Sequence, residues 1–195
     1  DAIKEKVRYQ LLLFKDKILM DSSSIDAKWG WKESQAMFIL PFIKELFPYM
    51  KLLHVIRDGR DIAFSEQQKA LYQASYVKIL NSNYSISPQH PEWPFFVSLA
   101  WQKVNMGVIN WAESNLEKNN FMTIRLEDMK YKKKETIENI MHFIDAKKKL
   151  KIFNSNFRKK HMRLEKYKKE DTNIVSKIEG SIGSSLLYFG YQLYD

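Results

Sequence analysis

Apolar residues recur at two different periods along this chain. Helical spacing of apolar residues predicts helices over residues 3–20, 35–47, 95–118, 133–144 and 173–189. Short apolar runs rich in β-prone residues predict strands over residues 27–32, 51–57 and 121–126. Because strands alternate with helices, we expect an α/β protein with three layers, in which a parallel sheet is flanked by helices on both sides.

Breaks in these patterns predict how the chain is organised. Pro41 interrupts the helical pattern of residues 35–47, so it must kink that helix or start a second helical piece. Residues 73–94 contain three prolines, and a loop of this length is either a binding loop or an insertion without function. The chain has 195 residues, which fits one domain over residues 1–195 with a sizeable core.

Composition excludes several classes of protein. The chain has no cysteine, which rules out disulfides, thiolate nucleophiles and cysteine-ligated metals, and fits a reducing compartment. No apolar run reaches the roughly 18 residues that a membrane span needs. We therefore expect a cytoplasmic protein, the alternative being a Golgi or membrane-anchored parent protein. The net charge of +9 predicts an anionic ligand, although solvated helix faces account for most of the lysine clusters.

Residues 51–65 form the stretch around which the candidate chemistry gathers. Arg57 ends the predicted strand, and Asp58 is placed to cap a following helix, with Asp61 answering as in a capping box. Ser65 would lie about two turns into that helix, eight residues after Arg57, with Lys69 one turn further on. Ligands of open α/β sheets bind beyond the carboxyl ends of strands, so Arg57 and Ser65 could together hold one phosphate.

Other candidates carry weaker signals. Lys32 would emerge at the carboxyl end of the strand over residues 27–32, although a surface lysine beside core tryptophans explains it equally well. His54 lies inside a predicted strand, which favours a hydrogen-bonded structural histidine over a catalytic base. The sequence has no Walker loop, no Gly-x-Gly-x-x-Gly, no histidine pair with metal-ligand spacing and no Gly-x-Ser-x-Gly elbow.

Taken in order, four blocks resemble the PAPS-dependent sulfotransferases, most closely their bacterial and Golgi-type branch. Residues 54–65 resemble the motif that binds the 3′-phosphate of the nucleotide, in which a serine follows an arginine by eight positions. The other three blocks are residues 29–34, which resemble a strand ending in a lysine, residues 124–129, which resemble Arg-Tyr-Glu-Asp-Leu, and residues 187–191, which resemble a closing Leu-Gly-Tyr.

The resemblance implies a P-loop-NTPase-like sulfotransferase fold and an enzyme that moves a sulfonate group from PAPS to a hydroxyl or amine. It implies that Arg57 and Ser65 bind the 3′-phosphate, that Lys69 contacts the nucleotide and that Lys32 approaches the sulfonate. Glu33 is the candidate catalytic base. The expected acceptor is a carbohydrate, a lipid, a peptide or a small molecule. No metal is needed if lysine and arginine supply the positive charge. No nucleic-acid partner is expected.

The chain departs from the family in its first 26 residues, where nothing matches the glycine-containing loop that holds the 5′-phosphosulfate. In the family, the strand before that loop lies between the counterparts of residues 51–57 and 121–127. Without it, we expect these two strands to face an empty slot, which is costly. We therefore expect an N-terminally incomplete domain. The alternative function is a non-catalytic basic protein of the same fold that binds a polyanion.

Overall fold

The computed structural model describes residues 5–6, 8–10, 12–13, 30, 32–65, 89–146 and 164–194. The chain divides into two compact units, Asp1–Lys51 and Leu52–Asp195, and each is described by itself. Whether they act as the predicted single domain stays a prediction. In the part of the chain just defined, no helix combines the length and apolar character needed to cross a membrane.

The first unit is helical. Its described residues between 5 and 13 are helical, and the 3-10 helix η1 (Ser34–Phe38) is followed by α2 (Leu40–Leu46). Pro41 lies in the first turn of α2, where its missing N–H has no intrahelical partner to lose, so it starts a second helical piece. The strand predicted over residues 27–32 is wrong at Gly30 and Lys32, which lie in no regular element, and its remaining residues fall outside the described ranges.

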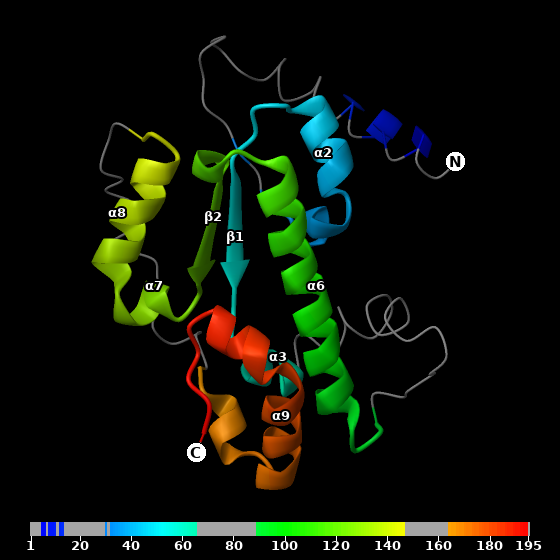
Figure 1. Cartoon of the computed structure of the whole chain (residues 1–195), viewed down its shortest axis with the longest axis vertical. Helices are drawn as coiled ribbons and strands as arrows, with labels where there is room; N and C mark the ends of the chain where they lie inside the picture. Colours follow the sequence, from blue (N-terminus) through cyan, green and yellow to red (C-terminus); the bar gives the residue numbers. More distant parts are fainter. Residues whose placement is uncertain are drawn as a thin grey trace. The chain divides into compact units, whose positions relative to one another are not determined.

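The second unit contains a parallel pair of strands, β1 (Leu52–Ile56) and β2 (Phe121–Arg125), as Figure 1 shows. Leu52 lies opposite Phe121, and the register continues to the pair Ile56 and Arg125. The predicted parallel arrangement is confirmed, but the expected empty slot between these strands is wrong. The strands pair directly, and the N–H of Leu126 donates to the carbonyl of Ile56 at 2.7 Å.

The helices of the second unit largely follow the predicted ranges. They are α3 (Gly59–Ala63), α6 (Trp93–Asn115), α7 (Asp128–Tyr131), α8 (Lys133–Phe143) and α9 (Thr172–Tyr188), with the 3-10 helices η3 (Lys118–Asn120) and η6 (Lys166–Lys169). Helix α6 begins two residues earlier than expected, with Pro94 in its first turn. Helix α9 begins at a strong cap, because the Asp171 carboxylate accepts the N–H groups of Asn173 and Ile174.

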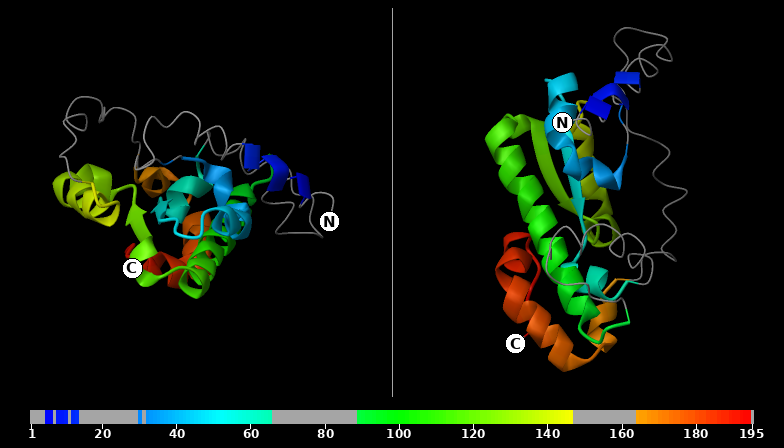
Figure 2. Two further views of the ribbon diagram at one scale, coloured as in Figure 1. Left: turned by 90° about the horizontal axis from the view of Figure 1, so that it is seen from above. Right: turned by 90° about the vertical axis from the view of Figure 1, so that its right-hand side faces the viewer.

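Helix α6 runs beside the sheet, and α9 packs against α6 and α3 beyond the carboxyl end of β1, as Figures 1 and 2 show. Trp101 of α6 and Ile182 of α9 are almost fully buried in the core that results. His54 points toward α6, where its Nε2 lies 2.9 Å from Asn105 Oδ1. Burial lowers the pKa of His54 and so favours its neutral form. The buried hydrogen bond to Asn105 fits the predicted structural role.

Candidate functional site at the end of strand β1

The candidate site begins where β1 ends and the short helix α3 follows. The carbonyl of Arg57 accepts a hydrogen bond from Trp101 Nε1 at 2.9 Å, which anchors the strand end to α6. Gly59 lies directly against the Trp101 ring, and every residue of α3 is buried. A residue with a side chain at position 59 would collide with that ring, so the sequence needs a glycine there for packing.

Asp58 caps α3 as predicted, because its Oδ1 accepts the N–H of Arg60 at 2.9 Å. The second half of the predicted capping box is wrong. The N–H of Asp58 donates to Glu127 Oε1 at 3.0 Å, so a glutamate at the end of β2 takes the place expected for Asp61. Because Glu127 accepts this hydrogen bond, the Asp61 side chain is available for other contacts.

Arg60 is the most deeply buried cation among the described residues, with 2% of its side chain exposed. Its guanidinium forms a bidentate pair with Asp58, at 3.0 and 2.7 Å, and a second ion pair with Glu179 of α9. It also donates to the carbonyl of Gln192 at 2.8 Å and lies 4.2 Å from the centre of the Tyr167 ring. These contacts tie α3 to α9, to η6 and to the C-terminal residues.

Asp61 and Arg57 form the next layer of this network. Arg57 Nη2 donates to Asp61 Oδ2 at 3.0 Å, with 20% of the Arg57 side chain and 1% of the Asp61 side chain exposed. The same carboxylate accepts the main-chain N–H groups of Glu165 and Lys166 at 2.8 and 2.7 Å. Arg57 is therefore held in place by Asp61, and a fifth of its side chain remains exposed.

Ser65 does not lie in a helix, which corrects the prediction. Helix α3 ends at Ala63, and the N–H of Ser65 closes a turn on the carbonyl of Ile62 at 3.1 Å. Arg57 and Ser65 therefore stand on either side of one five-residue helix, and Ser65 is 8% exposed. Lys69 lies outside the described residues.

Lys32 and Glu33 belong to the first unit. Both are exposed, and Lys32 precedes η1 without belonging to a strand. Glu33 is the N-cap of η1, where its carboxylate accepts the N–H of Gln35 at 3.0 Å. That hydrogen bond lowers the pKa of Glu33.

Glu127 closes the site on the side of β2. Its Oε1 accepts the N–H of Asp58, and its Oε2 accepts the hydroxyl of Tyr191 at 2.9 Å. Burial raises the pKa of Glu127 even though both hydrogen bonds favour the carboxylate. Burial also raises the pKa of the Tyr191 hydroxyl, which therefore remains the proton donor of this pair.

The raised pKa of Glu127 predicts a pH-dependent contribution to stability. Between its ordinary pKa and its raised folded value, the folded chain binds more protons than the unfolded chain, so this residue lowers stability as pH rises. We expect Glu127→Gln to remove that component, because the glutamine amide does not titrate in this range. The amide oxygen can still accept the Asp58 N–H, so the rest of the site is kept. Urea unfolding of both proteins from pH 4 to 7 measures it: the stability of the wild type relative to the variant should fall with pH. A difference that is independent of pH would contradict the prediction.

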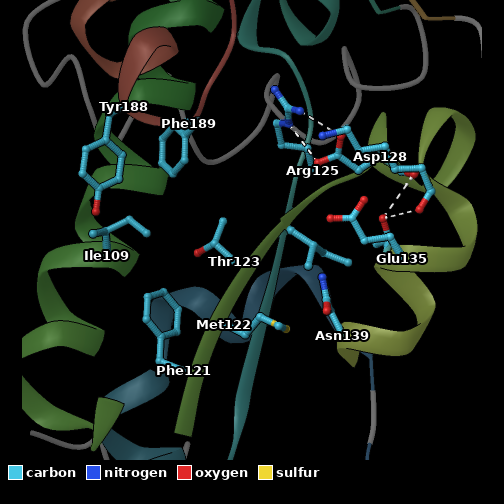
Figure 3. Close-up of a pocket in the computed structure, with 13 residues that line it drawn as sticks. Ile109, Phe121, Met122, Thr123, Arg125, Asp128, Glu135, Asn139, Tyr188 and Phe189 are labelled. Carbon is cyan, nitrogen blue, oxygen red and sulfur yellow. Dashed lines mark hydrogen bonds and ion pairs between the residues drawn. The ribbon is translucent and has the colours of Figure 1, made fainter. Parts of the chain in front are cut away.

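A groove of about 420 Å³ runs along β2. Figure 3 shows it between Ile109, Tyr188 and Phe189 on one wall and Glu135 and Asn139 of α8 on the other. None of Lys32, Glu33, Arg57 and Ser65 lines this groove. This groove is thus separate from the predicted phosphate site.

Sequence reasoning missed the main-chain N–H groups of residues 165–167 and the carboxylate of Glu127. The N–H groups carry no signal, because any residue type supplies them. Glu127 does carry a sequence signal: it directly follows the predicted strand over residues 121–126, and the carboxyl ends of parallel strands meet at one edge of a sheet.

Comparison with known proteins gives the site its context. The model of the Sulfotransferase family matches residues 2–149, about three quarters of the chain. No curated protein and no solved structure matches. Among the described residues, no three histidine, cysteine or acidic side chains gather in a way that could hold a metal ion. Because the family match extends over most of the sequence and includes the stretch from β1 to Ser65, the chain belongs to the sulfotransferase family.

Proposed function

We propose that this chain binds PAPS and transfers its sulfonate group to a hydroxyl or amine acceptor. The observation that carries the proposal is the placement of Arg57 and Ser65 at the two ends of α3, beyond the carboxyl end of β1. A guanidinium and a hydroxyl so placed suit the 3′-phosphate of the nucleotide. The family match supports sulfonate transfer in general.

The residues present fit an anionic nucleotide. Asp61 holds the Arg57 guanidinium at 3.0 Å, and 20% of the Arg57 side chain is exposed, which supports a cation of fixed position near the surface. In the proposed reaction, the acceptor oxygen or nitrogen bonds to sulfur as the sulfur–oxygen bond to the 5′-phosphate breaks. The acceptor gives up a proton, and adenosine 3′,5′-bisphosphate leaves. In such a transfer, positioned cations stabilise the charge that spreads over the sulfonate oxygens and the leaving 5′-phosphate.

Three further residues have proposed roles. Lys32 would stabilise the sulfonate oxygens, and Lys69 would contact the nucleotide. Glu33 would accept the proton of the acceptor. The cap of η1 weighs against Glu33, because a carboxylate whose pKa is lowered by the Gln35 N–H is a weaker proton acceptor.

Titration with adenosine 3′,5′-bisphosphate tests the proposal. We expect Arg57→Ala to weaken binding by roughly 10- to 100-fold, the loss of one charge-assisted contact to a phosphate. Arg125→Ala is the matched control: it removes the same charge from the end of β2, where Arg125 pairs with Asp128 at 2.8 Å. We expect the control to stay within about threefold of wild type, since Arg125 lies at the end of β2 and is not part of the proposed phosphate site.

Two outcomes would contradict the proposal. If both arginine variants weakened bisphosphate binding equally, binding would depend only on the net charge of the protein. Tight binding to a DNA duplex with a steep salt dependence, and none to the bisphosphate, would indicate a basic polyanion-binding protein instead.

A further inference from the structure

Asp61 joins two parts of the chain that are 105 residues apart in the sequence. Its carboxylate accepts the N–H groups of Glu165 and Lys166 at 2.8 and 2.7 Å and, at a longer 3.4 Å, that of Tyr167. It also accepts Arg57 Nη2 at 3.0 Å. Since only 1% of this side chain is exposed, these donors rather than water satisfy its charge.

The backbone of the late segment is shaped around this carboxylate. Glu165 has φ 60° and ψ 31°, the left-handed conformation, which residues other than glycine seldom adopt. The consecutive N–H groups of residues 165–167 then converge on one carboxylate, as in an anion-binding nest. In this molecule the bound anion is the Asp61 carboxylate itself. Asp61 is not needed to complete the cap of α3, because Glu127 accepts the Asp58 N–H.

We propose that Asp61 is a positioning residue for the phosphate site. It holds one edge of the Arg57 guanidinium, and the segment Glu165–Tyr167 keeps it in place. This inference rests on the proposed function. A guanidinium that is already oriented loses less conformational freedom when a phosphate binds, so docking of the late segment strengthens binding through Arg57 without touching the ligand.

A purely structural anchor would behave differently from a positioning residue. Loss of an anchor would weaken binding of every nucleotide in the same proportion, because it loosens the fold as a whole. Loss of a positioning residue for Arg57 would weaken only the contact that Arg57 makes. The ratio of the affinities for a nucleotide with a 3′-phosphate and for one without it therefore distinguishes the two roles.

The test is calorimetric titration of the full chain with adenosine 3′,5′-bisphosphate and with adenosine 5′-monophosphate. We expect the wild type to prefer the bisphosphate, and Asp61→Asn to reduce this preference about tenfold while monophosphate binding changes less than about twofold. Asp128→Asn is the matched control, because it weakens the Arg–Asp pair at the end of β2 and should leave the preference unchanged. An undiminished preference in Asp61→Asn overturns the inference.

A second measurement uses only the wild-type chain, in case Asp61→Asn does not fold. Coupling between two sites is reciprocal, so a phosphate bound at Arg57 should slow hydrogen exchange at the N–H groups of Glu165 and Lys166. We expect the bisphosphate to slow this exchange more than the monophosphate does. Equal exchange with both ligands overturns the inference alone. A wild type without preference for the bisphosphate overturns the proposed function, and this inference with it.

Discussion

Replacing Arg60 with alanine should lower the free energy of unfolding by about 3–5 kcal/mol, the cost of leaving buried charges without their partner. Asp58 and Glu179 are 8% and 10% exposed in their side chains, so water cannot replace the lost guanidinium. The variant also loses the contact with Tyr167 and the donor to Gln192. Urea denaturation followed by far-UV circular dichroism measures the change.

Arg125→Ala is the control for this loss. The pair of Arg125 with Asp128 is about a quarter exposed on each side, and Arg125 also donates to the carbonyl of Gly190, so we expect a smaller cost of about 1–2 kcal/mol. A further variant that combines Arg60→Met, Asp58→Asn and Glu179→Gln removes all three charges together and should recover part of the stability. The explanation fails if Arg60→Ala costs no more than Arg125→Ala.

Gly59→Ala should destabilise the fold by about 1–3 kcal/mol through overpacking. A Cβ at this position would lie 2.6 Å from Cε3 and 2.7 Å from Cδ2 of Trp101. The ring cannot move aside easily, because it is 2% exposed and its Nε1 donates to the Arg57 carbonyl. We also expect weaker bisphosphate binding, since any shift of Trp101 displaces the strand end that carries Arg57.

Gly107 provides the matched control for this substitution. It lies in α6, and nothing stands within 4 Å of a Cβ added there, so Gly107→Ala should be neutral or stabilising by up to about 1 kcal/mol. The double variant Gly59→Ala with Trp101→Leu should destabilise by less than the sum of the two single variants, because the smaller side chain makes room. Additive costs would show that the ring is not the obstacle.

The long helices were predictable because their signals are local. Helices α6, α8 and α9 each begin and end within a few residues of the expected positions, since apolar spacing and caps lie within the segment itself. Both strands at the site were also predicted, together with their parallel arrangement. The same local signals overstated α3: continued helical spacing placed Ser65 in a helix that ends at Ala63.

The errors near the site come from contacts with distant residues. The spacing of Asp58 and Asp61 predicts a capping box, because a capping box depends only on neighbours in sequence. In the fold, Glu127 from the end of β2 takes that hydrogen bond, and Asp61 turns to a segment far along the chain. The expected slot between the strands was wrong for a related reason: the family's strand order was assumed, whereas β1 and β2 pair directly here.

The sequence by itself determined the strand β1, the turn and the start of α3, the need for a cap at Asp58 and the family of the chain, because each rests on residue types at short spacing. The tertiary structure alone decided what surrounds Arg57. Arg60 pairs with Glu179, which lies 119 residues further along the chain. Asp61 is held by main-chain N–H groups, which cannot be predicted from residue type. Long-range pairs of this kind depend on how elements pack, and packing is settled only when the whole core forms.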